Sequence, residues 1–180
     1  MRILLDAGHG GDVAFGGDPG AIGIELTKES KTNLDVILML GMILEQNGQE
    51  VLYTRTSDVY ISPSQRTNII NSVQPDIFIS VHCNSSDNPS ANGIEALYRD
   101  DNDKDLAINI QTALVDATGL KNRGVKNDVN ELHRKLAVLS GLPQVAACLV
   151  EIGFISNAID FEMIKNTELI AGAIAQGAMA

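Results

Sequence analysis

The chain has 180 residues, with 13 Lys and Arg against 23 Asp and Glu, a formal net charge of −10, two Cys and no Trp. A chain of this size buries roughly 70% of the surface that its unfolded form exposes, so it needs neither a disulfide nor a metal ion to hold a core together. Its hydrophobic fraction of 44% excludes a disordered chain, and its acidity argues against nucleic acid or an anionic membrane as a partner, because both repel it.

Apolar runs of strand length alternate with longer stretches of helical periodicity, a pattern typical of strands joined by crossover helices. It predicts an α/β fold in a single domain, with a mixed, mostly parallel sheet and helices on both faces. The expected strands are Arg2–Leu5, Glu50–Thr54, Asp76–His82, Gly93–Tyr98, Leu136–Leu139 and Val145–Val150. The expected helices are Glu29–Gln46, Pro63–Ser72, Asp103–Ala117, Asn157–Ile164 and Glu168–Met179.

Local signals set the ends of several of these elements. Asn47-Gly48 should end the first helix, with the glycine in the left-handed conformation. The run Ser62–Gln65 combines an N-cap serine, a proline at the first helical position and the glutamine of a capping box. Thr167 is the expected N-cap of the last helix. The Gly-rich segment Asp6–Thr27 lacks periodicity and is too long for a plain connection, which favours a functional role.

The two cysteines, Cys83 and Cys148, lie inside or beside apolar runs, which predicts buried free thiols rather than a disulfide. No stretch approaches the roughly 18 consecutive apolar residues of a membrane-spanning helix, so no membrane insertion is expected. Met1-Arg2 runs directly into an apolar strand without the long apolar region and cleavage site of a secretion signal, so none is expected either.

Ligands of an open α/β sheet collect beyond the carboxyl ends of its strands, where candidate chemical groups should therefore be sought. His9 follows the first strand, His82 ends the third, and Glu29 stands at the start of the first helix. Two imidazoles and one carboxylate form a known catalytic zinc set, which leaves a fourth position for water or substrate. These residues predict a mononuclear zinc hydrolase. The alternative is that each histidine only caps a strand or binds a loop carbonyl.

Glu151 directly follows the apolar run Val145–Val150. A carboxylate at this position should be partly desolvated, which raises its pKa and suits a general base. The alternative is a glutamate that leaves the core at a strand end for solvent.

The Gly-rich segment after the first strand invites comparison with a phosphate-binding loop. The run Gly8–Val13 lacks the last glycine of the dinucleotide fingerprint, and the chain has no Gly-Lys-Ser or Gly-Lys-Thr ending of a P-loop. Nucleotide binding is therefore not expected.

A series of sequence blocks runs along nearly the whole chain. They are Asp6-Ala7-Gly8-His9-Gly10-Gly11, Asp18-Pro19-Gly20-Ala21, Lys28-Glu29 with Asn33-Leu34, Thr54-Arg55 with Asp58, Ser80-Val81-His82-Cys83-Asn84-Ser85, Gly93-Ile94-Glu95, Asn122-Arg123-Gly124-Val125-Lys126 and Glu151-Ile152-Gly153-Phe154-Ile155-Ser156-Asn157. In this order they closely resemble the motifs of the zinc-dependent N-acetylmuramoyl-L-alanine amidases, the cell-wall hydrolase family Amidase_3. Residues 1–180 thus resemble one whole catalytic domain.

The resemblance implies hydrolysis of the amide between the lactyl group of N-acetylmuramic acid and the L-alanine that begins the stem peptide of peptidoglycan. It implies one Zn²⁺ per chain, with His9, Glu29 and His82 as ligands and Glu151 as the catalytic acid/base. This set coincides with the one reached from the residues. The implied substrate is peptidoglycan or a muramoyl peptide, met at the cell wall by a mature domain or through a phage-type release system. A separate wall-targeting module outside this chain is compatible with the resemblance, and a monomer is the default.

Two other side chains compete for the metal. Glu25 lies in the same Gly-rich segment, but only Glu29 has the family-like Lys-Glu setting, and a ligand on a helix start is fixed more rigidly than one on a loop. Cys83 follows His82 and offers a thiolate, yet adjacent residues on a strand point to opposite faces, which favours a core position.

Arg123 and Lys126 could meet the carboxylates of a stem peptide, a role that suits the bidentate fork of arginine. Plain surface charge is the alternative, and the sequence favours neither. With a net charge of −10, attraction to an anionic wall must come from such local groups or from a partner module. The remaining histidine, His133, stands among charged residues and is interpreted as a solvated loop residue rather than a substrate contact.

Three polar residues near the expected site carry open alternatives. Asp6 either holds the ring of His9, since ligating imidazoles donate their other N–H to an oxygen, or caps the loop. Asn84 and Ser85 have the same ambiguity.

Two further functions also remain: a zinc peptidase or deacetylase that uses the same site on another acyl bond, and an inactive wall-binding module. The presence of all four proposed site residues argues against the inactive module.

Overall fold

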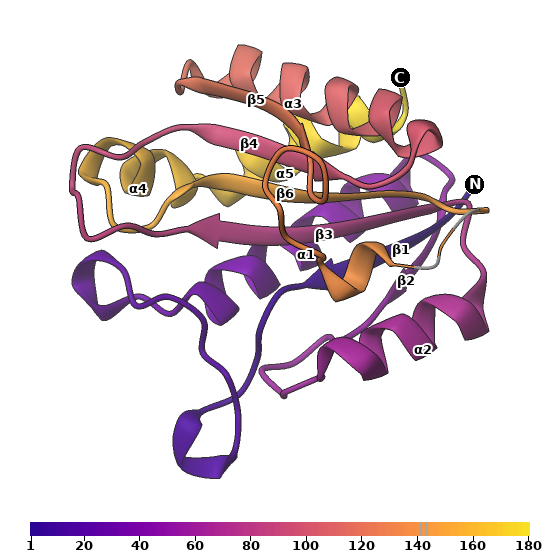
Figure 1. Cartoon of the computed structure of the whole chain (residues 1–180), viewed down its shortest axis with the longest axis horizontal. Coiled ribbons are helices and arrows are strands. Elements are labelled where there is room, and N and C mark those ends of the chain that lie inside the picture. Colours follow the sequence, from indigo (N-terminus) through magenta and orange to yellow (C-terminus); the bar gives the residue numbers. More distant parts are fainter. Residues whose placement is uncertain (141, 143) are drawn as a thin grey trace.

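The structure is a computed structural model that describes residues 1–140, 142 and 144–180. Within these residues a six-stranded sheet has the order β2-β1-β3-β6-β4-β5 (Figure 1). The strands are β1 (Arg2–Ala7), β2 (Glu50–Tyr53), β3 (Ile77–Asn84), β4 (Ile94–Tyr98), β5 (Asn122–Asn127) and β6 (Ala146–Phe154). The α-helices are α1 (Glu29–Gln46), α2 (Pro63–Val73), α3 (Lys104–Thr118), α4 (Ala158–Ile164) and α5 (Thr167–Ala178). Short 3₁₀ helices are η1 (Val13–Phe15), η2 (Ile24–Leu26), η3 (Asp101–Asp103) and η4 (Ala137–Leu139).

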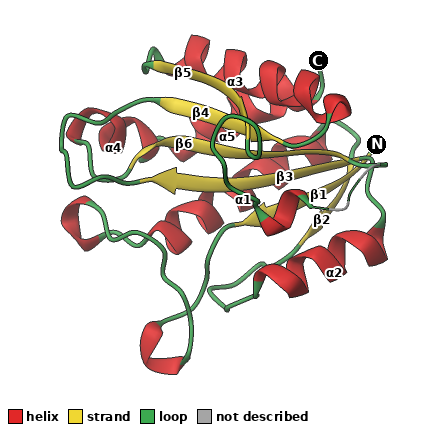
Figure 2. Cartoon of the chain, viewed as in Figure 1, coloured by secondary structure: helices red, strands yellow, loops and turns green. Residues whose placement is uncertain are grey.

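Most neighbouring strands of the sheet are parallel (Figure 2). β1 pairs in parallel with β2 and β3, and β3 pairs in parallel with β6. β4 then runs antiparallel to β6 and parallel to β5. The predicted α/β fold, with a mixed and mostly parallel sheet, is confirmed.

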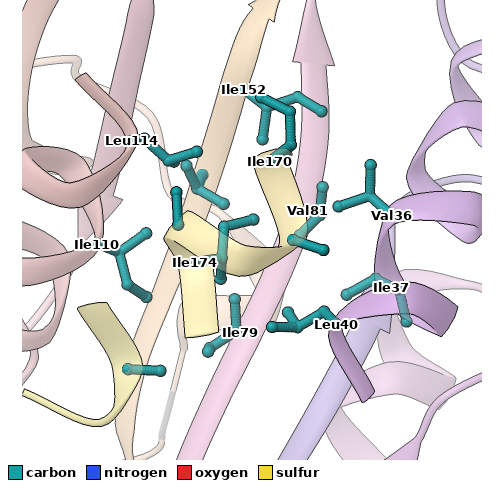
Figure 3. Close-up of a cluster of buried hydrophobic side chains, with 14 of the residues drawn as sticks. Val36, Ile37, Leu40, Ile79, Val81, Ile110, Leu114, Ile152, Ile170 and Ile174 are labelled. Atoms are coloured by element: carbon teal, nitrogen blue, oxygen red, sulfur yellow. The ribbon is translucent and has the colours of Figure 1, made fainter. Parts of the chain in front are cut away.

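Helices α1, α3 and α5 cover one face of the sheet and form the larger core (Figure 3). This core takes alternate residues of β3, from Ile77 through Ile79 and Val81 to Cys83, as the period of two in a strand requires. Fully buried aliphatic side chains from all three helices meet there, including Leu40, Ile110 and Ile174. Each such side chain contributes roughly 1.5–3 kcal/mol relative to an exposed one, so this layer accounts for most of the hydrophobic stabilisation.

Helix α2 and the 3₁₀ helix η4 cover the other face with a smaller core. On the strands this second core includes Phe78, Leu97 and Leu149. The next residues on the same face, toward the carboxyl ends of β3 and β6, include His82 and Glu151. Because this second core is small, the candidate chemical groups at the carboxyl ends of β3 and β6 lie outside it.

The local structure differs from the sequence prediction in three places. The apolar run Leu136–Leu139 forms η4 rather than a strand, because it packs against α2 and buries Val138 and Leu139 there without pairing with the sheet. Strand β5 was not expected, because Asn122–Asn127 is a polar, half-buried edge strand without apolar alternation. Thr167 lies inside α5, and the side chain of Asn166 is the cap, accepting from the Leu169 amide at 3.3 Å.

Other helix signals are confirmed. Ser62 and Gln65 form the capping box at the start of α2. Helix α1 ends at Gln46, and Gly48 just beyond it has φ 76°, the left-handed conformation in which glycine lacks the strain of a side chain. Both cysteines are buried as free thiols. Among the residues described, no helix is both long and apolar enough to cross a membrane.

A buried ion pair joins α2 to the carboxyl end of β1. The guanidinium of Arg66, 4% exposed, pairs with the carboxylate of Asp6, which is fully buried. Asp6 also accepts hydrogen bonds from the hydroxyls of Thr54 and Ser80, both at 2.6 Å. Arg66 donates in addition to the carbonyl of His9 at 2.6 Å. One buried contact therefore connects β1, β3, α2 and the loop that begins the site.

Replacing Asp6 with Asn should lower the free energy of unfolding by about 3–5 kcal/mol, because the buried charge of Arg66 loses its counter-charge. The matched control is Glu50→Gln, which makes the same chemical change in the exposed Arg2–Glu50 pair. That control should cost less than about 1 kcal/mol. Urea unfolding followed by circular dichroism measures both; equal midpoints for the two variants would contradict the assigned role of the buried pair.

Candidate functional site

The three predicted metal ligands come together in the structure. His9 follows β1, Glu29 is the first residue of α1, and His82 lies in β3; one ligand atom from each lies within 4.8 Å of the other two. Nε2 of His9 is 3.3 Å and Nδ1 of His82 is 3.0 Å from the same oxygen, Oε1 of Glu29. The two imidazole rings meet edge to face, with centroids 4.9 Å apart. Glu25 lies outside this group and is exposed on η2.

Glycines allow the backbone to approach these ligands closely. A Cβ at Gly8 would lie 2.3 Å from Cε1 and Nε2 of the His82 ring. A Cβ at Gly20 would lie 2.5 Å from Oε2 of Glu29, and Gly20 also has φ +67°. Neither position can hold a larger residue unless a ligand moves. The Gly-rich composition of this segment is thus in part a packing requirement of the site.

Asp18, rather than Asp6, holds the ring of His9. Nδ1 of His9 is 2.8 Å from Oδ2 of Asp18, which leaves Nε2 facing Glu29. This is the carboxylate–histidine arrangement that fixes the tautomer and orientation of a metal-ligating imidazole. The alternative for Asp6 as the partner of His9 is therefore wrong, because its carboxylate is taken up by the buried pair with Arg66. Sequence reasoning missed Asp18, although it stands in one of the family-like blocks.

An isolated β-bridge and two buried arginines, Arg55 and Arg66, hold the backbone around His9 in place. Gly10 and Asp18 exchange backbone hydrogen bonds of 2.7 and 2.8 Å, which closes the base of the loop. The guanidinium of Arg55 donates to the carbonyls of Gly8 at 2.9 Å and Ser30 at 2.8 Å, alongside the Arg66 bond to the His9 carbonyl. His9 itself has φ 60°, an uncommon conformation for a residue other than glycine. These contacts keep it there.

The carboxylate of Glu29 is equally well held. Oε2 accepts from the Ala21 amide at 2.9 Å, and Oε1 accepts from the Cys83 amide at 3.1 Å. The thiol of Cys83 points the other way, into the larger core, where its Sγ is 3.5 Å from the side-chain oxygen of Asn33. The core position expected for Cys83 is confirmed.

The electrostatics of the group favour a cation. Burial alone would lower the pKa of His9, but the hydrogen bonds and charges of Glu29 and Asp18 raise it to about 9. Burial alone would raise the pKa of Glu29, yet the hydrogen bonds from both histidines hold it far below its usual range. The carboxylates of Glu29 and Asp18 therefore make the site electrostatically favourable for a cation. Its ligand atoms, two imidazole nitrogens and one carboxylate oxygen, are of the kind that Zn²⁺ binds. The residues present fit the ion that the sequence implies.

Glu151 lies on β6 directly beside this group. It is in register with His82 on the parallel strand β3 and with Glu95 on the antiparallel strand β4. Its Oε2 atom is buried without a hydrogen-bond partner among the described residues. Burial raises the pKa of Glu151 to about 7; the charge of His82 opposes the rise, and those of Glu29 and Glu95 add to it. The carboxyl group is thus suited to exchange a proton near neutral pH.

Arg123 and Lys126 converge on Glu95. Nε of Arg123 is 3.0 Å from Oε2 of Glu95, Nζ of Lys126 binds the same oxygen, and the side-chain amide of Asn84 donates to Oε1 at 3.1 Å. Arg123 also lies over the ring of Phe154, 4.9 Å from its centre. Burial would raise the pKa of Glu95, but the hydrogen bonds from Lys126 and Arg123 lower it. The two cations are therefore fixed in place on Glu95, which is itself in register with Glu151, rather than scattered on the surface.

Two of the remaining polar residues lie apart from the metal group. His133 is exposed, has φ 51°, and is not part of the ligand cluster. The Ser85 amide donates to the side chain of Asn84 at 2.9 Å. The interpretation of His133 as a solvated loop residue agrees with its exposure.

Residues 3–180 match the family model Amidase_3, N-acetylmuramoyl-L-alanine amidase. The chain is 35% identical over 167 residues to N-acetylmuramoyl-L-alanine amidase LytC of Bacillus subtilis, a match that covers 91% of this chain and 31% of LytC. It is 30% identical to the probable cell wall amidase LytH of Staphylococcus epidermidis, over 97% of this chain and 56% of LytH. The chain thus spans about a third and about half of the lengths of these two relatives.

Solved structures agree with this match. The catalytic domain of the N-acetylmuramoyl-L-alanine amidase CwlV from Bacillus (Paenibacillus) polymyxa var. colistinus superposes with a TM-score of 0.87 at 30% identity, over 98% of this chain and 95% of that one. The N-acetylmuramoyl-L-alanine amidase from Clostridium difficile 630 gives a TM-score of 0.88 at 29% identity, over 99% and 95%. With the family model matching nearly its whole length, the chain belongs to the Amidase_3 family of N-acetylmuramoyl-L-alanine amidases.

Proposed function

We propose that this chain is a single catalytic domain that hydrolyses the amide between N-acetylmuramic acid and L-alanine in peptidoglycan. In this proposal His9, Glu29 and His82 hold one Zn²⁺ ion, and Glu151 is the acid/base. The observation that carries the proposal is the register of β3 and β6, which sets a buried carboxyl with a pKa near 7 beside a candidate metal ligand. Membership of the family supports the choice of amide.

The chain's own residues account for the movement of protons. When bound, Zn²⁺ polarises the scissile carbonyl and lowers the pKa of water toward about 7. Glu151 takes a proton from the attacking water as the water oxygen bonds to the carbonyl carbon. The carbon–nitrogen bond then breaks, and Glu151 returns the proton to the departing amine of L-alanine. Water and amide thus give a carboxylate and a free amino terminus, and Asp18 keeps the ring of His9 in place throughout.

We assign the stem peptide of the substrate to Arg123 and Lys126. These two cations share the single carboxylate of Glu95, which leaves one positive charge in surplus in an otherwise acidic protein. Both side chains retain some exposure, 29% and 23%, so they can reach a ligand. A stem-peptide carboxylate is the complementary group.

The reaction itself is tested on a purified muramoyl peptide. Incubation should release peptide with a new amino-terminal L-alanine, because the proposed cut lies directly before that residue. Dansylation or mass spectrometry identifies the new terminus. Release of acetate would instead indicate a deacetylase, and a cut inside the stem a peptidase; either result refutes the proposed amide.

Changing Glu151 to Gln should reduce turnover by about 10²–10⁴-fold, because the amide cannot accept the proton from water. Zinc content should be unchanged, since Glu151 lies outside the ligand group. The control is Glu168→Gln, the same change at an exposed position of α5. Rates on the muramoyl peptide and metal analysis are measured together. Full activity in the Glu151 variant removes its catalytic role, and loss of zinc reassigns it to the metal site.

The native protein should bind one zinc ion per chain and lose activity to a chelator, with recovery on addition of zinc. Glu29→Gln and His82→Ala should each remove the ion, whereas the control His133→Ala should retain it, because His133 lies apart from the cluster. Asp18→Asn should weaken zinc binding about 10–100-fold through the orientation of His9. Elemental analysis and competition with a zinc indicator measure these changes. Equal zinc content in all four variants would exclude the proposed ligand set.

A further inference from the structure

A hollow opens at the metal group, on the face of the sheet that carries His82. It is a cavity of about 200 Å³ that reaches both His9 and His82. One wall is the segment Tyr60–Pro63, which leads into α2, and the other is Leu136–Val138 around η4. Leu149 of β6 also lines it. We call this cavity the α2–η4 pocket.

The pocket is suited to an uncharged occupant. Its walls are mostly aliphatic and aromatic side chains. The charged groups that line it already have partners: Asp6 is paired with Arg66, and Asp18 holds His9. Away from the two histidines, a charged ligand would lose hydration there without gaining a free counter-charge, so a neutral group with aliphatic parts is favoured in that part of the pocket.

The order of the strands in the sheet sets the order in which the site residues follow one another across it. From β1 through β3, β6 and β4 to β5, the groups follow as His9, His82, Glu151, Glu95 and then the pair Arg123 and Lys126. The α2–η4 pocket includes the first two of these groups in its lining and none of the later ones. The pocket therefore lies toward one end of this row and the cationic pair at the other end, with Glu151 between His82 and the cations.

Amide hydrolysis fixes which half of a substrate lies on which side. The group that protonates the departing amine must be next to that amine, so the leaving peptide lies toward Glu151 and the cations beyond it. The acyl half then lies on the opposite side of the scissile bond. We propose that the α2–η4 pocket binds the acyl half of the substrate, namely the lactyl group of muramic acid and the adjoining atoms of the amino sugar. This inference rests on the proposed function.

The size of the cavity agrees with such an occupant. The cavity volume of about 200 Å³ is many times the roughly 10–15 Å³ that one water molecule needs, so the cavity can admit a small organic group. A lactyl ether and an acetamido arm are groups of this kind. The rest of the glycan would extend outward past Tyr60, which is 42% exposed at the start of the wall.

Ala137 offers a direct test, because it is exposed and lines the pocket, so a larger side chain there fills the cavity without entering the core. The rates compared are kcat/KM for a muramoyl peptide and for the same peptide carrying an acetyl group in place of the muramoyl group. Ala137→Phe should lower the ratio of the two values about tenfold or more, because only the muramoyl substrate uses the pocket. The control Ala158→Phe, at an exposed position of α4, should leave the ratio unchanged. Arg123→Ala should lower both values by the same factor, since both substrates carry the peptide.

The other outcomes are distinct. If Ala137→Phe lowers both values equally, or changes neither, the acyl half does not occupy the pocket and the inference fails. A native protein that hydrolyses neither substrate refutes the proposed function instead. Binding then decides the pocket separately: titration with the neutral amide of N-acetylmuramic acid should shift the methyl resonances of Ala137 and Val138 and leave that of Ala158 in place. Unshifted Ala137 and Val138 methyl groups would overturn the assignment of the pocket.

Discussion

The buried pair between Arg66 and Asp6 is the contact on which the rest of the site depends. A carboxylate this deep is stable only with a counter-charge and filled hydrogen bonds, and Asp6 receives both, from Arg66, Thr54 and Ser80. The same guanidinium donates to the carbonyl of His9. One side chain therefore joins the stability of the fold to the position of a candidate metal ligand, and the loop after β1 cannot shift without breaking a buried interaction.

The alternation of side chains along β3 places core residues on one face of the sheet and a site residue on the other. Val81 and Cys83 enter the larger core, while His82 between them faces the thinly covered side. The reversal of β4 completes the arrangement, because it brings Glu95 near the start of one strand opposite Glu151 near the end of another. A site built only from parallel strand ends would lack this neighbour. The reversed strand thus adds a second carboxylate, already neutralised by cations, next to the one whose pKa is raised.

The parts of the molecule that could be predicted from sequence are those with a strong local pattern. Continuous apolar runs indicated the central strands, and His9 and His82 were found because each stands at the end of such a run. Strand β5 and Asp18 were not found, for a common reason: their roles arise from contacts between distant segments and leave no periodicity. The error at Leu136–Leu139 has the same origin, since an apolar run of that length does not show whether it pairs with a sheet or packs on a helix.

The loop after β1 divides into two parts with different freedom. Below the bridge between Gly10 and Asp18, the residues next to the metal group are held by arginine hydrogen bonds and by close backbone approaches at Gly8 and Gly20. Above it, residues 11–17 form a lobe that projects away from the sheet (Figure 1), and Phe15, the last residue of η1 within this lobe, is 92% exposed. The bridge closes the base of the lobe, and bonds from the Gly11 amide to Asp58 and from Lys28 to Asp12 tie the lobe to neighbouring segments. Substitutions or insertions around the exposed Phe15 are therefore expected to leave the geometry of the metal group unchanged.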